Sequence, residues 1–228
     1  MNKPLNRLQI VRRRIESACA AAGRQAEEVS LLVVSKRHSA ENVIIFNELG
    51  ILDFGENQLQ EALGKQSELR HLDLRWHFIG SIQSNKTRDI AANFQWVHSV
   101  DRTKILQRLA RQRPLDSDPL NICLQVNIDM EPQKAGASAD EILQLAALAD
   151  SLDSIRLRGL MAIPKLSNDP KQQHASFRKV RQLFEKLKRS GHDIDTLSMG
   201  MSADLEIAIA EGSTMVRIGT DLMGSRPA

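Results

Sequence analysis

The sequence predicts an α/β protein folded as a single (β/α)8 TIM barrel, with one extra helix at its N-terminus. Eight short apolar runs alternate with longer helical patterns, as expected for parallel strands joined by crossover helices. Several runs, such as 31–34 and 122–126, are apolar without alternation, which is typical of strands buried on both faces. The length of 228 residues suits one barrel domain over residues 1–228.

The elements are expected in a regular order. Leu5, Leu8, Val11 and Ile15 form one apolar stripe, so a first helix is expected at 5–22 and ends at Gly23. Strands are expected at 30–36, 51–54, 75–79, 95–99, 121–128, 156–163, 196–199 and 214–218. Further helices are expected at 39–48, 57–68, 84–93, 102–112, 139–150, 171–190 and 203–211. Asp101 and Ser202 are the predicted N-caps of the helices that follow them. Because such a strand count can be off, an open doubly wound sheet is the alternative to the barrel.

Composition gives no sign of a nucleic-acid or membrane protein. The net charge is +3, aromatic residues make up 4%, and basic and aromatic residues are not interleaved. The basic runs at 12–14 and 186–189 lie in helical patterns and are interpreted as solvated helix faces. No window approaches the ~20 apolar residues of a membrane span. Cys19 and Cys123 lack a pairing motif, so both are expected to be reduced, and the protein is expected to be cytoplasmic.

Metal and hydrolase sites are not indicated either. The histidines show no i,i+4 pairing and no CxxC partners, so no metal site is expected. They are His38, His71, His77, His98, His174 and His192. The sequence contains no GxSxG motif and no P-loop, and no Ser-His-Asp order can be picked out.

Candidate functional residues follow the predicted strands, because parallel barrels build their active sites at the C-terminal strand ends. The first strand ends at Lys36. A partly desolvated lysine amine can attack an aldehyde, and an apolar barrel core below it would provide that desolvation. The alternative is a lysine that extends its amine into solvent. The same rule selects Gly55-Glu56-Asn57, Gly80-Ser81 and Ile163-Pro164.

Two glycine turns near the C-terminus predict a phosphate site. They are Gly200-Met201-Ser202, before the helix expected at 203–211, and Gly219-Thr220, after the last strand. Glycine permits a close approach of the backbone, hydroxyls can donate, and the amides and dipole of a helix N-terminus suit an anion. Asp204 counts against the site, since it would repel a phosphate unless it points outward. The alternative is a pair of ordinary turns.

A lysine amine and a phosphate site together suggest pyridoxal 5'-phosphate (PLP), which carries both an aldehyde and a phosphate. Arg217 lies just inside the last predicted strand, where its charge needs an acceptor. The pyridine nitrogen of PLP would serve, and an arginine would leave that nitrogen unprotonated and the ring a weak electron sink. The alternative partner is a nearby carboxylate.

Six ordered motifs carry a resemblance to a known family. They are Val33-Val34-Ser35-Lys36, Phe54-Gly55-Glu56-Asn57, Trp76-His77-Phe78-Ile79-Gly80 with Gln83-Ser84-Asn85-Lys86, Arg158-Gly159-Leu160-Met161-Ala162-Ile163-Pro164, Leu197-Ser198-Met199-Gly200-Met201-Ser202 and Val216-Arg217-Ile218-Gly219-Thr220. In these motifs the chain resembles the pyridoxal phosphate homeostasis protein family, also called proline synthase co-transcribed homologues. The resemblance implies a barrel similar to the N-terminal domain of alanine racemase, with PLP held as a Schiff base.

The resemblance also implies roles for single residues. Lys36 matches the Schiff-base lysine, Arg217 the arginine that faces the pyridine nitrogen, and Asn57 a residue near the ring. The matches to the phosphate cradle are Ser202, Gly219 and Thr220, with Met201 adjacent. The family is regarded as monomeric carriers or regulators of PLP that affect vitamin B6 and amino-acid pools, with PLP-dependent apoenzymes as acceptors. An established catalytic activity is not part of that description.

The sequence departs from many relatives at positions that concern cofactor transfer. A second lysine is replaced by His38, a tyrosine by Gln58, and the chain ends at Ala228 without a lysine-bearing extension. Lys134 does match a lysine proposed as a secondary PLP contact. Transfer through secondary lysines is therefore the least supported of the implied properties.

Two enzyme functions are weighed against the carrier. A racemase of this architecture resembles a two-base machine, with the Schiff-base lysine and a tyrosine from a second domain. This chain contains no tyrosine, so a non-catalytic PLP carrier or regulator is expected. The alternatives are a weak or narrow amino-acid racemase or lyase that uses Lys36 alone, and a phosphate-sugar barrel enzyme without PLP.

Overall fold

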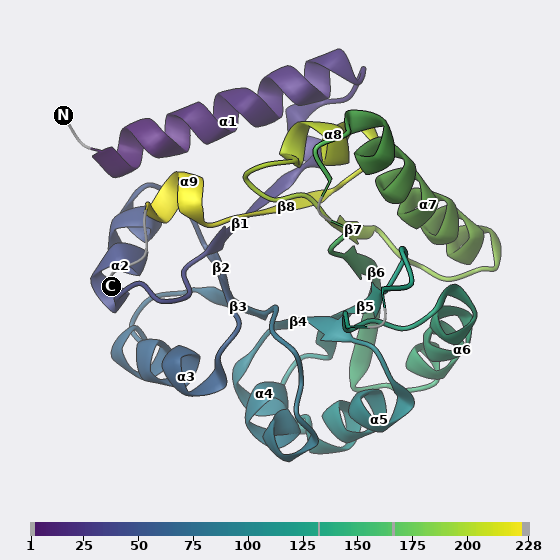
Figure 1. Cartoon of the computed structure of the whole chain (residues 1–228). Helices are drawn as coiled ribbons and strands as arrows, with labels where there is room; N and C mark the ends of the chain where they lie inside the picture. Colours follow the sequence, from purple (N-terminus) through teal and green to yellow (C-terminus); the bar gives the residue numbers. More distant parts are fainter. Residues whose placement is uncertain (1–2, 132, 166, 225–228) are drawn as a thin grey trace.

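The structure, a computed structural model, describes residues 3–131, 133–165 and 167–224. They form a closed barrel of parallel strands in the order β1-β2-β3-β4-β5-β6-β7-β8. The helices surround the barrel, and α1 lies across one side of it, over α8 and α9 (Figure 1). The closed order confirms the (β/α)8 barrel with an extra N-terminal helix and excludes the open doubly wound sheet.

Every predicted strand is present within a few residues of its expected bounds. The strands are β1 (Ser30–Val34), β2 (Asp53–Glu56), β3 (Arg75–Phe78), β4 (Trp96–Val100), β5 (Leu120–Val126), β6 (Ile155–Ala162), β7 (Thr196–Ser198) and β8 (Met215–Ile218). Each pairs in parallel with its neighbours, and β8 closes the barrel by pairing with β1. The C-terminal strand ends therefore meet at one mouth of the barrel.

The helices expected from the sequence are present with differences near their ends, whereas the last helix, at Thr220–Met223, was not predicted. They are α1 (Lys3–Ala21), α2 (Ala40–Glu48), α3 (Leu59–Glu68), α4 (Thr87–Asn93), α5 (Thr103–Gln112), α6 (Ala139–Asp150), α7 (Pro170–Arg189), α8 (Leu205–Ala210) and α9 (Thr220–Met223). Short 3-10 helices, η1 (Ala26–Glu28) and η2 (Ser84–Lys86), were not predicted. No helix in the described ranges is long and apolar enough to span a bilayer.

Both predicted N-caps are wrong. The N-cap position of α5 is Arg102, and the Asp101 carboxylate pairs with the Arg102 guanidinium instead of capping the helix. α8 begins only at Leu205, with Asp204 at its N-cap position, so Ser202 lies in the preceding turn. The physical reason is that Asp204 Oδ1 accepts the amide of Met201 at 2.6 Å, which folds residues 201–204 into a turn before the helix starts.

The barrel interior is more polar than expected. Apolar residues fill the space between strands and helices, and one large cluster includes Val33, Phe54 and Val97. Inside the barrel, however, polar side chains are buried beside a small cluster of Trp96, Cys123 and Met161. These polar residues are His77, His98, Ser198 and Arg217. The expectation of an apolar core below Lys36 is therefore corrected.

Gly159 marks a β-bulge whose geometry admits only glycine. The β5–β6 pairing shifts register beside it, its φ is +146°, and an added Cβ would lie 2.0 Å from the Thr196 carbonyl oxygen. We expect Gly159→Ala to lower the free energy of unfolding by about 2 kcal/mol or more, since backbone strain and a steric conflict add. Urea denaturation measures the change. Gly64→Ala, in α3 with open space around it, is the control and should add about 0.5–1 kcal/mol; equal stability of the two variants would contradict the expectation.

Candidate functional site

A cavity of about 430 Å³ opens at the C-terminal mouth of the barrel. This volume lies within the ~300–1,000 Å³ typical of small-molecule sites. Its lining consists of Val34, Lys36, His38, Asn57, Ile79, Gly80, Ser81, Ile163, Met201, Ser202, Ala203, Arg217, Gly219, Thr220 and Gly224. The fold thus brings together at one cavity the residues expected to bind the cofactor, which are Lys36, Asn57, Met201, Ser202, Arg217, Gly219 and Thr220. A larger hollow of about 610 Å³ between α1 and α8 is lined largely by alanine and arginine and contains none of them.

Lys36 lies in the turn that follows β1, half-buried at the cavity wall. The next residue, Arg37, has a φ of 63°, which is unusual for a residue other than glycine. The amide of Arg37 donates to Glu61 Oε1 at 2.5 Å. On the other side of Lys36, the hydroxyl of Ser35 donates to Glu56 Oε1 at 2.6 Å. The backbone is therefore fixed on both sides of Lys36.

A buried ion pair between Lys65 and Glu56 packs against the turn that contains Lys36. Lys65 Nζ donates to Glu56 Oε1 at 2.7 Å, to Glu61 Oε1 at 2.7 Å and to the Ser35 carbonyl at 2.8 Å. Glu56 is fully buried, and burial raises its pKa although Lys65 acts against that shift. Glu56 was selected from the sequence as part of a strand-end motif, but its side chain anchors the turn and does not line the cavity.

Arg217 lies in β8 at the base of the cavity and is 4% exposed. Its Nη1 donates to the carbonyl and, at 2.8 Å, to the hydroxyl of Ser198, and its Nη2 donates to the Ala162 carbonyl at 3.0 Å. In the described part of the chain no carboxylate pairs with it, so the predicted alternative of a local ion pair is wrong. Burial lowers its pKa to about 10, which still leaves it protonated near pH 7.

The guanidinium keeps donor capacity for a ligand. It carries five N–H groups, and the protein acceptors above take three of them. Since Arg217 borders the cavity, the two others are available to an acceptor that enters it.

The two predicted phosphate turns lie side by side at the cavity. Among the described residues, the amides of Ser202, Ala203 and Thr220 donate to no protein acceptor. A Cβ at Gly219 would make only ordinary contacts, 3.5 Å from Val34, and its φ of −111° suits any residue. The fold does not require glycine there, so its absent side chain leaves room in the cavity instead.

Part of the phosphate prediction needs correction. The Met201 amide is occupied by Asp204 Oδ1 and is not available to an anion. Asp204 is turned toward that amide and does not line the cavity, so its carboxylate does not face an anion there; burial raises its pKa. The helices α8 and α9 span only six and four residues, so loop amides rather than a long helix dipole face the cavity.

Arg14 of α1 joins the two turns from outside. Its Nη2 donates to the Ser202 carbonyl at 2.8 Å, its Nη1 to Asp221 at 2.5 Å, and its Nε to Glu206 at 2.6 Å. The interpretation of residues 12–14 as a solvated face is therefore wrong for Arg14, which connects the two turns through its hydrogen bonds. The basic run in a helical pattern did not indicate that Arg14 would contact these distant residues.

The histidines were expected to be unpaired and to bind no metal ion, and the structure bears on these two expectations separately. In the described ranges no group of three or more His, Cys, Asp or Glu side chains could hold a metal ion. His77 and His98 are nevertheless fully buried and lie 2.9 Å apart, Nδ1 to Nε2. Their mid-strand positions in β3 and β4 are the signal that could have revealed them as interior residues, since alternate strand residues face the barrel.

We expect these histidines to make the protein labile to mild acid. Burial lowers the pKa of His98 well below its usual value, and it lowers that of His77 despite the hydrogen bond to Asp53. Below about pH 6.5 the unfolded chain then binds more protons than the folded one, so stability falls with pH. The free energy of unfolding should drop by up to about 1.4 kcal/mol per pH unit for each histidine. Urea denaturation between pH 5 and pH 8 measures the slope.

The matched control for this slope is His71, which is exposed in the loop after α3. His71→Asn should leave the pH dependence of stability unchanged, whereas His98→Asn should flatten it. Stability that is constant from pH 5 to pH 8 in the unmodified protein would contradict the expectation.

The fold and its strand-end site define a barrel of the alanine racemase N-terminal type. Residues 8–227 match the family model described as alanine racemase, N-terminal domain. Among curated relatives, the pyridoxal phosphate homeostasis protein of Pseudomonas aeruginosa is 55% identical over 213 residues, covering 93% of this chain and 91% of that protein. The protein of the same name from Escherichia coli K12 is 44% identical over 229 residues, covering 99% and 98%. The chain belongs to the pyridoxal phosphate homeostasis protein family.

Solved structures agree with this family. PipY of Synechococcus elongatus, with PLP bound, is 36% identical, has a TM-score of 0.81, and matches 92% of this chain and 100% of its own. Alanine racemase of Clostridium difficile covers the whole chain with a TM-score of 0.77 at 16% identity, over 58% of the racemase. At that identity the racemase shows a shared fold only.

Proposed function

We propose that this chain binds PLP at the barrel mouth as a Schiff base on Lys36 and acts in PLP and amino-acid homeostasis as a carrier or regulator rather than a catalyst. One observation carries the proposal: a single cavity gathers an amine, a guanidinium and two turns with amides that donate to no acceptor among the described residues. The names of the relatives and the PLP-bound PipY structure support it. PLP-dependent apoenzymes would be the acceptors.

The lining residues fit the polar groups of PLP. The Lys36 amine can condense with the aldehyde and release one water. The free amides of Ser202, Ala203 and Thr220, together with the two hydroxyls, can donate to a phosphate, and Gly219 leaves space for it. Asn57, which follows β2, also lines the cavity; it lies next to Gly80, where an added Cβ would lie 2.2 Å from the Asn57 carbonyl oxygen.

Arg217 supports a carrier rather than a catalyst. PLP supplies an electron sink when its ring nitrogen is protonated, and a protonated guanidinium facing that nitrogen donates to it without protonating it. The chain also has no tyrosine that could act as the second base of a racemase. Both features disfavour carbanion chemistry at this site.

His38 favours the second candidate, a weak or narrow racemase. This imidazole is buried at the cavity wall together with Lys36, and histidine is the side-chain type that exchanges protons near neutral pH. A lysine and a histidine at one cavity could serve two faces of a substrate. Turnover of L- or D-alanine by the PLP-loaded protein, abolished by His38→Ala, would support the racemase over the carrier.

The test of the proposed function is a PLP titration followed by visible absorbance, borohydride reduction and peptide mapping. A visible band with the reduced adduct on Lys36, and no turnover of either alanine enantiomer, is the expected result. Absence of a band would mean that the cavity holds another phosphate ligand, as in a phosphate-sugar barrel enzyme. An adduct spread over surface lysines would also contradict the proposal.

Gly219→Ala is expected to weaken PLP binding without destabilising the barrel. The new methyl would occupy cavity space beside Val34 and displace the phosphate from its donors. Because hydrogen bonds to charged groups contribute about 1.5–3 kcal/mol, affinity should fall about tenfold or more. Titration with PLP measures the loss, and titration with pyridoxal, which lacks the phosphate, is the control. An equal loss for both ligands would argue against a phosphate site here.

A further inference from the structure

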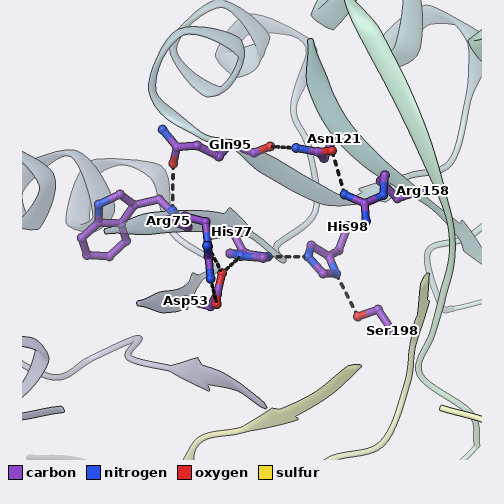
Figure 2. A network of polar contacts seen from close by, with 9 residues as sticks. Asp53, Arg75, His77, Gln95, His98, Asn121, Arg158 and Ser198 are labelled. Carbon is purple, nitrogen blue, oxygen red and sulfur yellow. Dashed lines mark hydrogen bonds and ion pairs between the residues drawn. The ribbon is translucent and has the colours of Figure 1, made fainter. Parts of the chain in front are cut away.

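A line of hydrogen-bonded side chains crosses the interior of the barrel. Asp53, at the start of β2, places Oδ1 3.0 Å from His77 Nε2, and His77 Nδ1 lies 2.9 Å from His98 Nε2. His98 Nδ1 lies 2.8 Å from the hydroxyl of Ser198 in β7, as Figure 2 shows. The line ends at the cavity, because the same hydroxyl accepts from Arg217 Nη1 at 2.8 Å.

The far end of this line is a fixed negative charge. Arg75 donates to both oxygens of Asp53, from Nε at 2.7 Å and from Nη2 at 2.6 Å (Figure 2). Burial alone would raise the pKa of Asp53, but the hydrogen bonds from Arg75 and His77 outweigh it and hold that pKa well below its usual range. Asp53 is therefore an acceptor only.

The protons of the line can be placed in one way when both imidazoles are neutral, as their lowered pKa values require. Asp53 can only accept, so the donors along the line must all point toward it, and the Ser198 hydroxyl, which accepts from Arg217, donates its own proton to His98 Nδ1. His98 then carries its proton on Nε2 and donates to His77 Nδ1. His77 carries its proton on Nε2 and donates to Asp53. Each proton position determines the next.

This arrangement of protons gives the buried guanidinium of Arg217 an oriented acceptor. Its charge is buried, and no carboxylate among the described residues pairs with it directly. The Ser198 hydroxyl, oriented by His98, and two backbone carbonyls are its acceptors. The charge of Asp204 favours the protonated guanidinium without pairing with it, whereas Asp53 is connected to Arg217 only through the chain of hydrogen bonds. None of Ser198, His98, His77 and Asp53 lines the cavity, so they can act on a ligand only through Arg217.

We propose that Ser198, His98, His77 and Asp53 form a relay that positions Arg217, fixing the rotation of its guanidinium so that its two unused N–H groups face the cavity. The relay itself follows from the protein alone. Its role toward a ligand rests on the proposed function, in which the acceptor is the pyridine nitrogen of PLP.

The relay can be tested in the protein without PLP. Nitrogen-15 NMR of the histidine side chains distinguishes the two neutral tautomers from each other and from the imidazolium. We expect both His77 and His98 to be neutral, with the proton on Nε2 and none on Nδ1. A charged imidazolium would interrupt the chain, and a proton on Nδ1 of either neutral residue would reverse its direction. Either result would overturn the relay.

The positioning role is tested with two serine variants, one at Ser198 in β7 and one at Ser213 in the loop before β8. Ser198→Ala removes the hydroxyl that joins His98 to Arg217. Ser213→Ala removes an equally buried hydroxyl that donates only to backbone carbonyls of Leu197, Met199 and Met215. We expect Ser198→Ala to weaken PLP binding about tenfold or more, and to shift the visible band of bound PLP, whereas Ser213→Ala changes neither. Ser198→Thr, which keeps the hydroxyl, should restore the band position.

The outcomes separate the two hypotheses. If the unmodified protein forms no PLP band, the proposed function and the positioning role fail together, while the NMR result still decides whether the relay exists. If PLP binds and Ser198→Ala behaves like Ser213→Ala in affinity and spectrum, the proposed function stands and the positioning role is overturned. A change in thermal stability common to both variants would be a packing effect and would not move the band.

Discussion

Lys36→Ala is expected to abolish the visible PLP band and the borohydride-fixed adduct while leaving the barrel folded. Lys36 is half-buried in a turn outside the strand and does not belong to the hydrophobic core cluster. The backbone of that turn stays fixed by the hydrogen bonds of Ser35 and Arg37. The other residues that line the cavity, including Arg217 and the two glycine turns, are also unchanged, so weak reversible PLP binding should persist without a covalent bond.

The matched control is Lys134→Ala. Lys134 lies beside the cavity rim, where its Nζ donates to the Pro164 carbonyl at 3.0 Å, next to the lining residue Ile163. If Lys36 is the amine that holds PLP, Lys134→Ala should keep the visible band and the mapped adduct. A band that survives in Lys36→Ala, or an adduct that moves to Lys134, would show that the nucleophile has been assigned to the wrong lysine.

The placement of the site could be predicted because it depends on local signals. Apolar runs located the strands, and parallel strands that end at one mouth must bring Lys36 and Arg217 together. Glycines marked the turns that leave space at that mouth, and Gly219 lies there with no steric need of its own. Pattern and topology were sufficient for these residues.

The relay and the Arg14 contact could not be predicted, because they join residues distant in sequence. His98 and Ser198 are 100 positions apart, and Arg14 and Ser202 are 188 apart. The position of a histidine inside a strand can mark it as an interior residue, but it does not indicate which distant side chain the imidazole bonds to. The turn at 201–204 was missed for a related reason. The hydrogen bond that Asp204 Oδ1 accepts from the Met201 amide delays the start of a helix that apolar spacing predicts to begin earlier.

Lys65→Met is expected to destabilise the protein by about 3–5 kcal/mol, the usual cost of removing one partner of a buried ion pair. Glu56 is fully buried, and its Oε2 has no hydrogen-bond partner among the described residues. Without the Lys65 ammonium, the Glu56 carboxylate would keep only the Ser35 hydroxyl. Urea denaturation at neutral pH measures the loss, and Lys179→Met on the exposed face of α7 is the matched control with an expected change within about 0.5 kcal/mol.

The pH dependence of this loss distinguishes an unpaired charge from a packing defect. Burial already raises the pKa of Glu56, and loss of the Lys65 charge should raise it further. An acid whose pKa is higher in the folded state binds a proton on folding, so its contribution to stability falls as pH rises above its unfolded value of about 4.3. The difference between Lys65→Met and the unmodified protein should therefore be smaller at pH 5 than at pH 8. Adding Glu56→Gln should recover part of the stability at pH 8, since the amide is neutral; a deficit that is constant with pH and unrelieved by Glu56→Gln would mean that Lys65 acts through packing alone.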